Sequence, residues 1–146
     1  MWVIVHAISG MALGAALGSE AAGLPLWALL LAALTAHALL DMVPHWDYTR
    51  RADSWAWAAG DVLAATASLL LVSQVWDAPT YVFWAGLVSA IPDLDVLDAV
   101  IPLKTRGRLF PSHWRAFPHG QARPVVGIVT QLGVVLVSGA VLVAIL

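Results

Sequence analysis

Five apolar segments, separated by mostly short polar connections, constrain the fold of this chain more than any other feature of its sequence. They cover about residues 2–17, 24–43, 54–75, 80–101 and 124–146. A helix needs about 20 apolar residues to cross the hydrocarbon core of a bilayer, and each segment comes close to that length. Only 11% of the residues are charged, against about 25% in typical soluble domains. We therefore expect an all-α fold, a polytopic membrane bundle of about five transmembrane helices that forms a single domain over residues 1–146.

The positive charges predict how this bundle is oriented. All seven Lys and Arg residues fall in the second and fourth connections, on the side of the N-terminus: Arg50, Arg51, Lys104, Arg106, Arg108, Arg115 and Arg123. The opposite side carries Glu20 and Asp77 and no cation. Cytoplasmic loops are enriched in Lys and Arg, so the N-terminus is predicted to be cytoplasmic. No cation precedes the first apolar segment, which favours a retained helix over a signal peptide. The expected location is a bacterial or archaeal inner (plasma) membrane.

The end of the second segment holds the first candidate site. His37 and Asp41 are four residues apart, so they share one face of a helix, a spacing that suits two ligands of one metal. Pro44 cannot continue the helix, which places His45 in the turn just beyond it. In the first segment, His6 shares a face with the glycines at 10, 14 and 18. Small residues at this spacing let another helix approach closely, so His6 is predicted to point into the bundle.

The ionisable residues also share one depth. Every histidine, and every aspartate except Asp77, falls on the cytoplasmic side or in that half of the predicted bundle. Ionisable groups inside a membrane are costly and usually functional. Carboxylates clustered away from water repel one another unless a cation neutralises them. The chain has no cysteine, so a metal would be held by His and carboxylate. We therefore expect one or two divalent ions, of Zn, Mn or Fe. Taken alone, a pair such as His37 and Asp41 also fits a buried hydrogen bond.

These patterns give each candidate residue a predicted role. The predicted metal ligands are His6, His37, Asp41, Asp93, Asp95 and His113. The predicted catalytic or ligand-orienting residues are Asp61, His45 and His119. The predicted contacts to a substrate phosphate or headgroup are Arg106, Arg108 and Arg115, because guanidinium groups make bidentate contacts to phosphate. The same arginines also fit a simple anchor to anionic lipid.

The motifs that contain these residues resemble those of the YdjM-like inner-membrane proteins, which are described as metal-dependent hydrolases. They are a histidine in the first helix (His6), an H-x-x-x-D-x-x-P segment (His37 to Pro44), a P-D-hydrophobic-D segment (Pro92 to Asp95) and a loop with His113 and His119. The patches are scattered along nearly the whole chain, in an order different from that of the family. The resemblance implies a metal site and, more broadly, hydrolysis.

Three functions fit the sequence. The leading hypothesis is a membrane-embedded metal-dependent hydrolase that acts on a lipid phosphoester or related bond at the cytoplasmic face. Its partners would be membrane lipid and a lipid-like or phosphorylated substrate, without nucleic acid, and the chain could form a homo-oligomer. One alternative is a non-catalytic subunit of a membrane complex, with haem or chlorophyll ligated by histidine. The other is a cation- or proton-coupled transporter that uses Asp61 and Asp93 as relay groups.

Overall fold

The computed structural model describes residues 1–18, 23–49, 51–95 and 108–146. The regular secondary structure of this part of the chain is all helical, with five α-helices and two short 3-10 helices joined by loops. In chain order these are α1 (Val3–Leu17), α2 (Leu26–Met42), α3 (Ser54–Val75), α4 (Thr80–Ala90), η1 (Ile91–Asp95), η3 (Pro111–His113) and α5 (Pro124–Ile145). The predicted all-α fold is confirmed for the described residues.

Four of the five predicted segments match an α-helix to within about two residues at each end. The segment 80–101 differs, because its α-helix ends at Ala90 and continues as the 3-10 helix η1. Pro92 accounts for the change: it lacks a backbone N–H, and its ring clashes with the carbonyl group of residue i−4 in an α-helix. The predicted helix beyond Asp95 lies outside the described residues.

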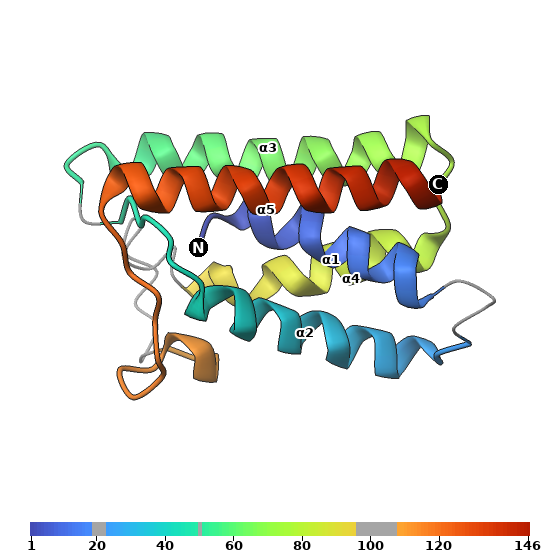
Figure 1. The fold of residues 1–146 in the computed structure, drawn as a ribbon, viewed down its shortest axis with the longest axis horizontal. Helices are drawn as coiled ribbons and strands as arrows, with labels where there is room; N and C mark the ends of the chain where they lie inside the picture. The colour runs from blue at the N-terminus through green and yellow to red at the C-terminus, as the bar shows by residue number, and fades with distance from the viewer. Residues whose placement is uncertain (19–22, 50, 96–107) are drawn as a thin grey trace.

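Helix α1 runs through the middle of the bundle and contacts the other four α-helices (Figure 1). Its glycines face α4. A Cβ atom on Gly10 would lie 2.5 Å from the Cβ of Ser89 and 2.6 Å from the carbonyl oxygen of Ala85. At Gly14 it would lie 2.8 Å from the Cβ of Ala85. The predicted ridge of small residues thus permits the close approach of α1 and α4. Helix α1 carries His6, and α4 continues into η1, which carries Asp93.

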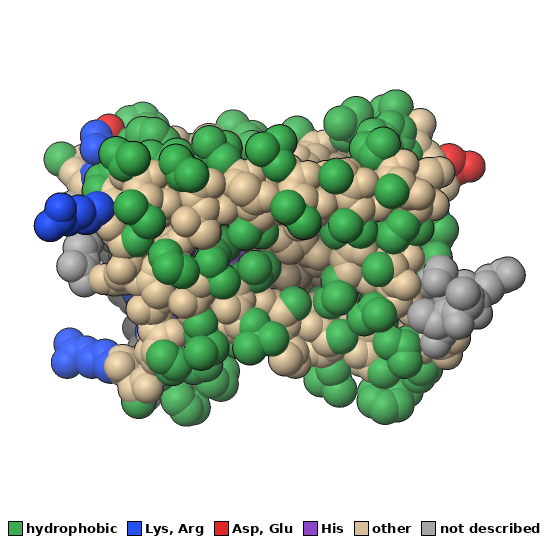
Figure 2. Space-filling model, in the orientation of Figure 1, with side chains coloured by type: hydrophobic (Ala, Val, Ile, Leu, Met, Phe, Trp, Pro, Cys, Tyr) green, Lys and Arg blue, Asp and Glu red, His purple; other side chains and the backbone are tan. Residues whose placement is uncertain are grey.

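Helices α3 and α5 are the two that are long and apolar enough to cross a membrane, by length and composition, among the described residues. Each has 22 residues, whereas α1 and α2 are shorter apolar helices of 15 and 17. Large apolar side chains face outward along both long helices, with Leu63 70% and Leu136 71% exposed. Figure 2 shows apolar side chains along the length of the molecule and Lys and Arg side chains at one end.

The end of the molecule that carries the Lys and Arg side chains is also where segments distant in the sequence lie together. The N-terminus, the end of α2 and the loop before α5 lie together there (Figure 1). His45 pairs with this loop: its N–H donates to the carbonyl of Gly120 at 2.6 Å, and its carbonyl accepts from the N–H of Ala122 at 2.8 Å. A side chain on Gly120 would clash with the carbonyl oxygens of Met42 and Val43. Gly120 therefore allows the loop that carries His113 and His119 to lie directly against the end of α2.

Candidate metal centre

Three ligand atoms form a nearly regular triangle at the end of α2. The Nε2 atom of His37 lies 3.2 Å from Oδ2 of Asp41, and the Nε2 atom of His113 lies 3.4 Å from both. A tetrahedral zinc ion with ligands at about 2.0–2.1 Å has neighbouring ligand atoms about 3.3–3.4 Å apart. The three atoms therefore have the spacing of one face of a tetrahedral site.

The rings of His37 and His113 are oriented by groups on their far side. Nδ1–H of His37 donates to the carbonyl oxygen of Ser89 at 2.7 Å. Nδ1 of His113 makes a short hydrogen bond with Oδ1 of Asp95. Because each Nδ1 carries the donated proton, Nε2 is the ring nitrogen of each histidine that is left to bind a metal at the triangle. Metal-ligating histidines are typically anchored in this way by a carbonyl or a carboxylate.

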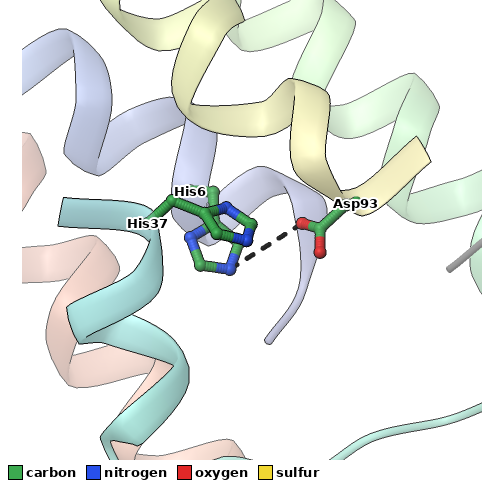
Figure 3. Close-up of side chains that lie close together, drawn as sticks. All are labelled: His6, His37 and Asp93. Atoms are coloured by element: carbon green, nitrogen blue, oxygen red, sulfur yellow. Dashed lines mark ion pairs between the residues drawn. The ribbon is translucent and has the colours of Figure 1, made fainter. Parts of the chain in front are cut away.

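A second group adds His6 from α1 and Asp93 from η1 to His37. The ring of His6 stacks on the ring of His37, with centroids 3.8 Å apart, and both rings lie beside Asp93 (Figure 3). Nε2 of His6 lies 3.8 Å from Oδ2 of Asp93 and 3.3 Å from Oδ1 of Asp41. His6, His37 and Asp93 each offer a ligand atom within 4.8 Å of the others, and all three residues are buried. This group therefore also has the composition and spacing to hold a metal ion.

A third group consists of Asp41, His45 and His119, with ligand atoms again within 4.8 Å of one another. Nδ1–H of His45 donates to the carbonyl oxygen of Val43 at 2.9 Å. Burial lowers the pKa of His45 to about 4, so its ring is neutral near pH 7 and Nε2 can bind a metal. Burial likewise lowers the pKa of His119. The sequence predicted catalytic roles for both histidines, and the structure brings both beside Asp41.

Buried polar atoms without a hydrogen-bond partner gather in these three groups. Among the described residues, five of the seven such atoms belong to them: both ring nitrogens of His6, Oδ2 of Asp41, Nε2 of His45 and Oδ2 of Asp93; the other two are Nε1 of Trp2 and Oγ of Ser89. Buried polar groups are nearly always satisfied, so a cluster of exceptions needs an explanation such as an ion. Oδ1 of Asp41 also accepts from the α-amino group of Met1 at 2.9 Å. A divalent cation bound here would satisfy the unpartnered carboxylate oxygens and imidazole nitrogens together.

Asp95 lies next to this centre without belonging to any of the three groups. Its Oδ1 contacts His113, while its Oδ2 accepts from the backbone N–H groups of Leu109 and Phe110 at 2.9 and 3.0 Å. Both carboxylate oxygens are thus already engaged. The structure gives Asp95 the position of a residue that orients His113, whereas the sequence predicted a direct metal ligand.

The side chain of Asp61, a residue of α3, lies at the N-terminus of α1. Its two oxygens accept from the backbone N–H groups of Val3 and Ile4, at 2.8 and 2.9 Å. The hydroxyl group of Tyr48 also donates to it at 3.0 Å, and burial raises the pKa of Tyr48, so this donor stays protonated. Asp61, predicted to be catalytic, therefore caps the helix that carries His6 and is absent from the three groups of possible ligands.

A polar pocket of about 380 Å³ adjoins the centre. Its lining includes His113 and His119, and the full set is Asp47, Arg108, His113, Trp114, Arg115, Phe117, His119 and Gln121. Arg108 also donates to the backbone carbonyl of Asp95 at 2.8 Å. Two of the three arginines predicted to contact a phosphate thus line this pocket, and Arg106 lies outside the described residues.

Besides the α-amino group of Met1, the contributions of Ser89 and Gln131 to the site were missed in the sequence. The carbonyl of Ser89 orients His37, and a backbone acceptor leaves no signal in a sequence. Gln131 is fully buried in α5, where it accepts from the N–H of Trp2 at 2.9 Å and donates to the carbonyl of Trp46 at 3.2 Å. A single amide in an apolar helix was the available signal, since such a group is rarely buried without a partner.

Comparisons of the chain with protein-family models, with curated proteins and with solved structures find no match. The geometry and chemistry of the centre are therefore the basis for assigning a function.

Proposed function

We propose that this protein is a membrane-embedded, metal-dependent hydrolase that cleaves a phosphoester at a centre built around Asp41. The observation that carries the proposal is the triangle of His37 Nε2, Asp41 Oδ2 and His113 Nε2, with edges of 3.2–3.4 Å. Anchored Nδ1 atoms behind both histidines support it, because they leave the two Nε2 lone pairs facing the same point.

Two ions fit the arrangement of the ligands. The inner ion would be held by Asp41, His37 and His113, with His6 and Asp93 nearby. The outer ion would be held by Asp41, His45 and His119, so that Asp41 belongs to both sets of ligands. Sets of imidazole and carboxylate suit Zn, Mn or Fe. The same residues carry the motifs that resemble the YdjM-like proteins.

Exposure of the apolar helices supports a membrane location. Large apolar side chains that face outward on α3 and α5 include Leu63, Leu70, Leu71, Val125, Val129, Leu136 and Val143. Monomeric soluble proteins rarely expose apolar surface on this scale. We infer that all five α-helices lie in the membrane, with the metal centre near one surface and the N-terminus in the cytoplasm of a bacterium or archaeon.

The polar pocket supports an anionic substrate. Divalent ions held by these residues would supply a bound water of lowered pKa and would neutralise charge on the phosphoester. Arg115 and Arg108 line the pocket and can contact the phosphate oxygens. Hydrolysis then consumes one water molecule, breaks one P–O bond and yields an alcohol and a phosphate, with the water protons shared between the products.

The test combines metal analysis with hydrolysis of p-nitrophenyl phosphate and bis(p-nitrophenyl) phosphate by protein purified in detergent. We expect turnover that EDTA abolishes and that added Zn or Mn restores. Arg115→Gln should raise KM with little change in kcat, whereas Arg123→Gln, at the start of α5 outside the pocket, should change neither. Metal-loaded protein that hydrolyses neither compound would contradict the proposal. A Soret band in protein without divalent metal would favour a haem-binding subunit.

A further inference from the structure

A second, apolar groove reaches the same metal centre from the side of the membrane-facing helices. It has a volume of about 140 Å³ and lies between α3 and η1 with the end of α4, where Val62, Thr66, Leu69 and Leu87 are among the lining residues. Asp93 also lines it. The groove therefore joins an apolar surface to a carboxylate of the centre.

Asp93 makes this groove more than an apolar gap between helices. The residue is only 4% exposed, and its Oδ2 has no hydrogen-bond partner among the described residues. Its Oδ1 lies 3.7 Å from Nε2 of His113, which lines the polar pocket. The groove and the polar pocket thus lie on either side of the contact between Asp93 and His113, and the groove is lined mostly by apolar residues.

We propose that the groove takes the first part of the hydrocarbon chain of an amphiphilic substrate, whose phosphate occupies the polar pocket. This assignment rests on the proposed function and specifies its substrate as a single-chain lipid phosphate or a lipid with a phosphoester next to its chain. Apart from Thr66 and Asp93 its lining residues are apolar, which suits an alkyl segment. The remainder of the chain would lie against exposed apolar side chains of α3, such as Leu70.

Thr66 provides a way to block the groove without disturbing the core. Its side chain is exposed, and its hydroxyl group bonds only back to the carbonyl of Val62 in the same helix, at 2.8 Å. Thr35 on α2 is a matched control: it is exposed and bonds back to the carbonyl of Leu31 at 2.9 Å. It is not among the residues that line the groove.

The experiment uses hexadecyl phosphate with a photoreactive diazirine near its phosphate end, added to the full chain in detergent micelles. After illumination, mass spectrometry maps the labelled peptides. We expect label on α3 and α4 near Leu69 and Leu87, and excess hexadecyl phosphate should compete it away. Thr66→Trp should reduce this labelling about tenfold, the effect of losing contact with about two methylene groups. Thr35→Trp should label as the unsubstituted protein does.

Leu87→Trp fills the groove from the α4 side and should reproduce the loss if Thr66→Trp does not fold. Label spread evenly over the exposed faces of α3 and α5, or unchanged in both groove variants, would overturn the assignment. The labelling reports where the lipid binds, so a negative labelling result overturns the groove alone. Failure of the proposed hydrolase activity is seen separately, as absent metal or absent turnover. Localised labelling in a protein that fails those two tests would still support the groove.

Discussion

The Nε2 atoms of His37 and His113, 76 residues apart in the chain, lie 3.4 Å from each other. Each ring donates its Nδ1 proton elsewhere, to the Ser89 carbonyl and to the Asp95 carboxylate. The two Nε2 atoms that remain face each other and Asp41. Oδ2 of Asp41 lies 3.2 and 3.4 Å from the same two atoms, so the three atoms are placed to bind one divalent ion together.

Asp95 tests whether the orientation of His113 matters. Replacing Asp95 with Asn removes the charge behind His113, which should make the imidazole a weaker ligand. Loss of such an outer partner typically lowers metal affinity about 10–100-fold, and a competition titration with a chromophoric zinc chelator would measure it.

Asp53 supplies the control for this prediction. It is an exposed aspartate whose carboxylate pairs with Arg51 at 2.6 Å, and exposed pairs contribute little to stability. Asp53→Asn should bind zinc as the unsubstituted protein does. Equal affinities for both variants would show that Asp95 has no influence on the metal.

Asp61 distinguishes a structural carboxylate from a catalytic one. Asp61→Ala removes the acceptor for the N–H groups of Val3 and Ile4, and the loss of a helix cap costs about 0.5–2 kcal/mol. The unfolding midpoint in detergent should fall while the metal content stays the same.

Tyr48→Phe, which removes one hydrogen bond to Asp61, should lower the free energy of unfolding by about 1 kcal/mol.

If Asp61→Ala kept full stability and metal but lost turnover, Asp61 would instead be a catalytic residue, as the sequence suggested.

Gly10 tests the close packing of α1 on α4. Gly10→Ala places a methyl group 2.5 Å from the Cβ of Ser89 and 2.6 Å from a backbone oxygen, and overpacking of this kind costs about 1–3 kcal/mol. Because Ser89 orients His37, the metal content should fall as well.

Gly139→Ala on α5 is the matched control, since a Cβ atom there meets nothing within 4 Å. Replacing an open helix glycine with alanine should stabilise the fold by up to about 1 kcal/mol. Thermal unfolding of the two variants side by side measures the difference, and equal midpoints would contradict the described contact between α1 and α4.

Most of the helices and part of the site were predictable from the sequence. The bounds of α3 followed from its apolar run, and the i, i+4 spacing of His37 and Asp41 correctly predicted neighbouring side chains. Residue type and predicted depth do not show which carboxylates already accept hydrogen bonds within the protein. Asp61 and Asp95 are carboxylates of the kind that bind metals, but backbone N–H groups from other segments donate to both oxygens of Asp61 and to Oδ2 of Asp95. These contacts depend on how the bundle closes, which periodicity does not encode.

His45 and His119 show the same limit from the other direction. Their place in a turn and a loop suggested catalytic residues at the surface. Backbone hydrogen bonds between His45 and the loop at Gly120 and Ala122 bring both side chains into the group that contains Asp41. Pairing between segments about 75 residues apart has no local signature.

Elemental analysis of the detergent-purified protein tests the central claim most directly. About two equivalents of Zn, Mn or Fe per chain are expected if Asp41 bridges two ions. His37→Ala should lose the inner ion, and Asp41→Asn should lose both ions together with any turnover. Full stoichiometric metal in the variant that combines both changes would contradict the metal centre described here.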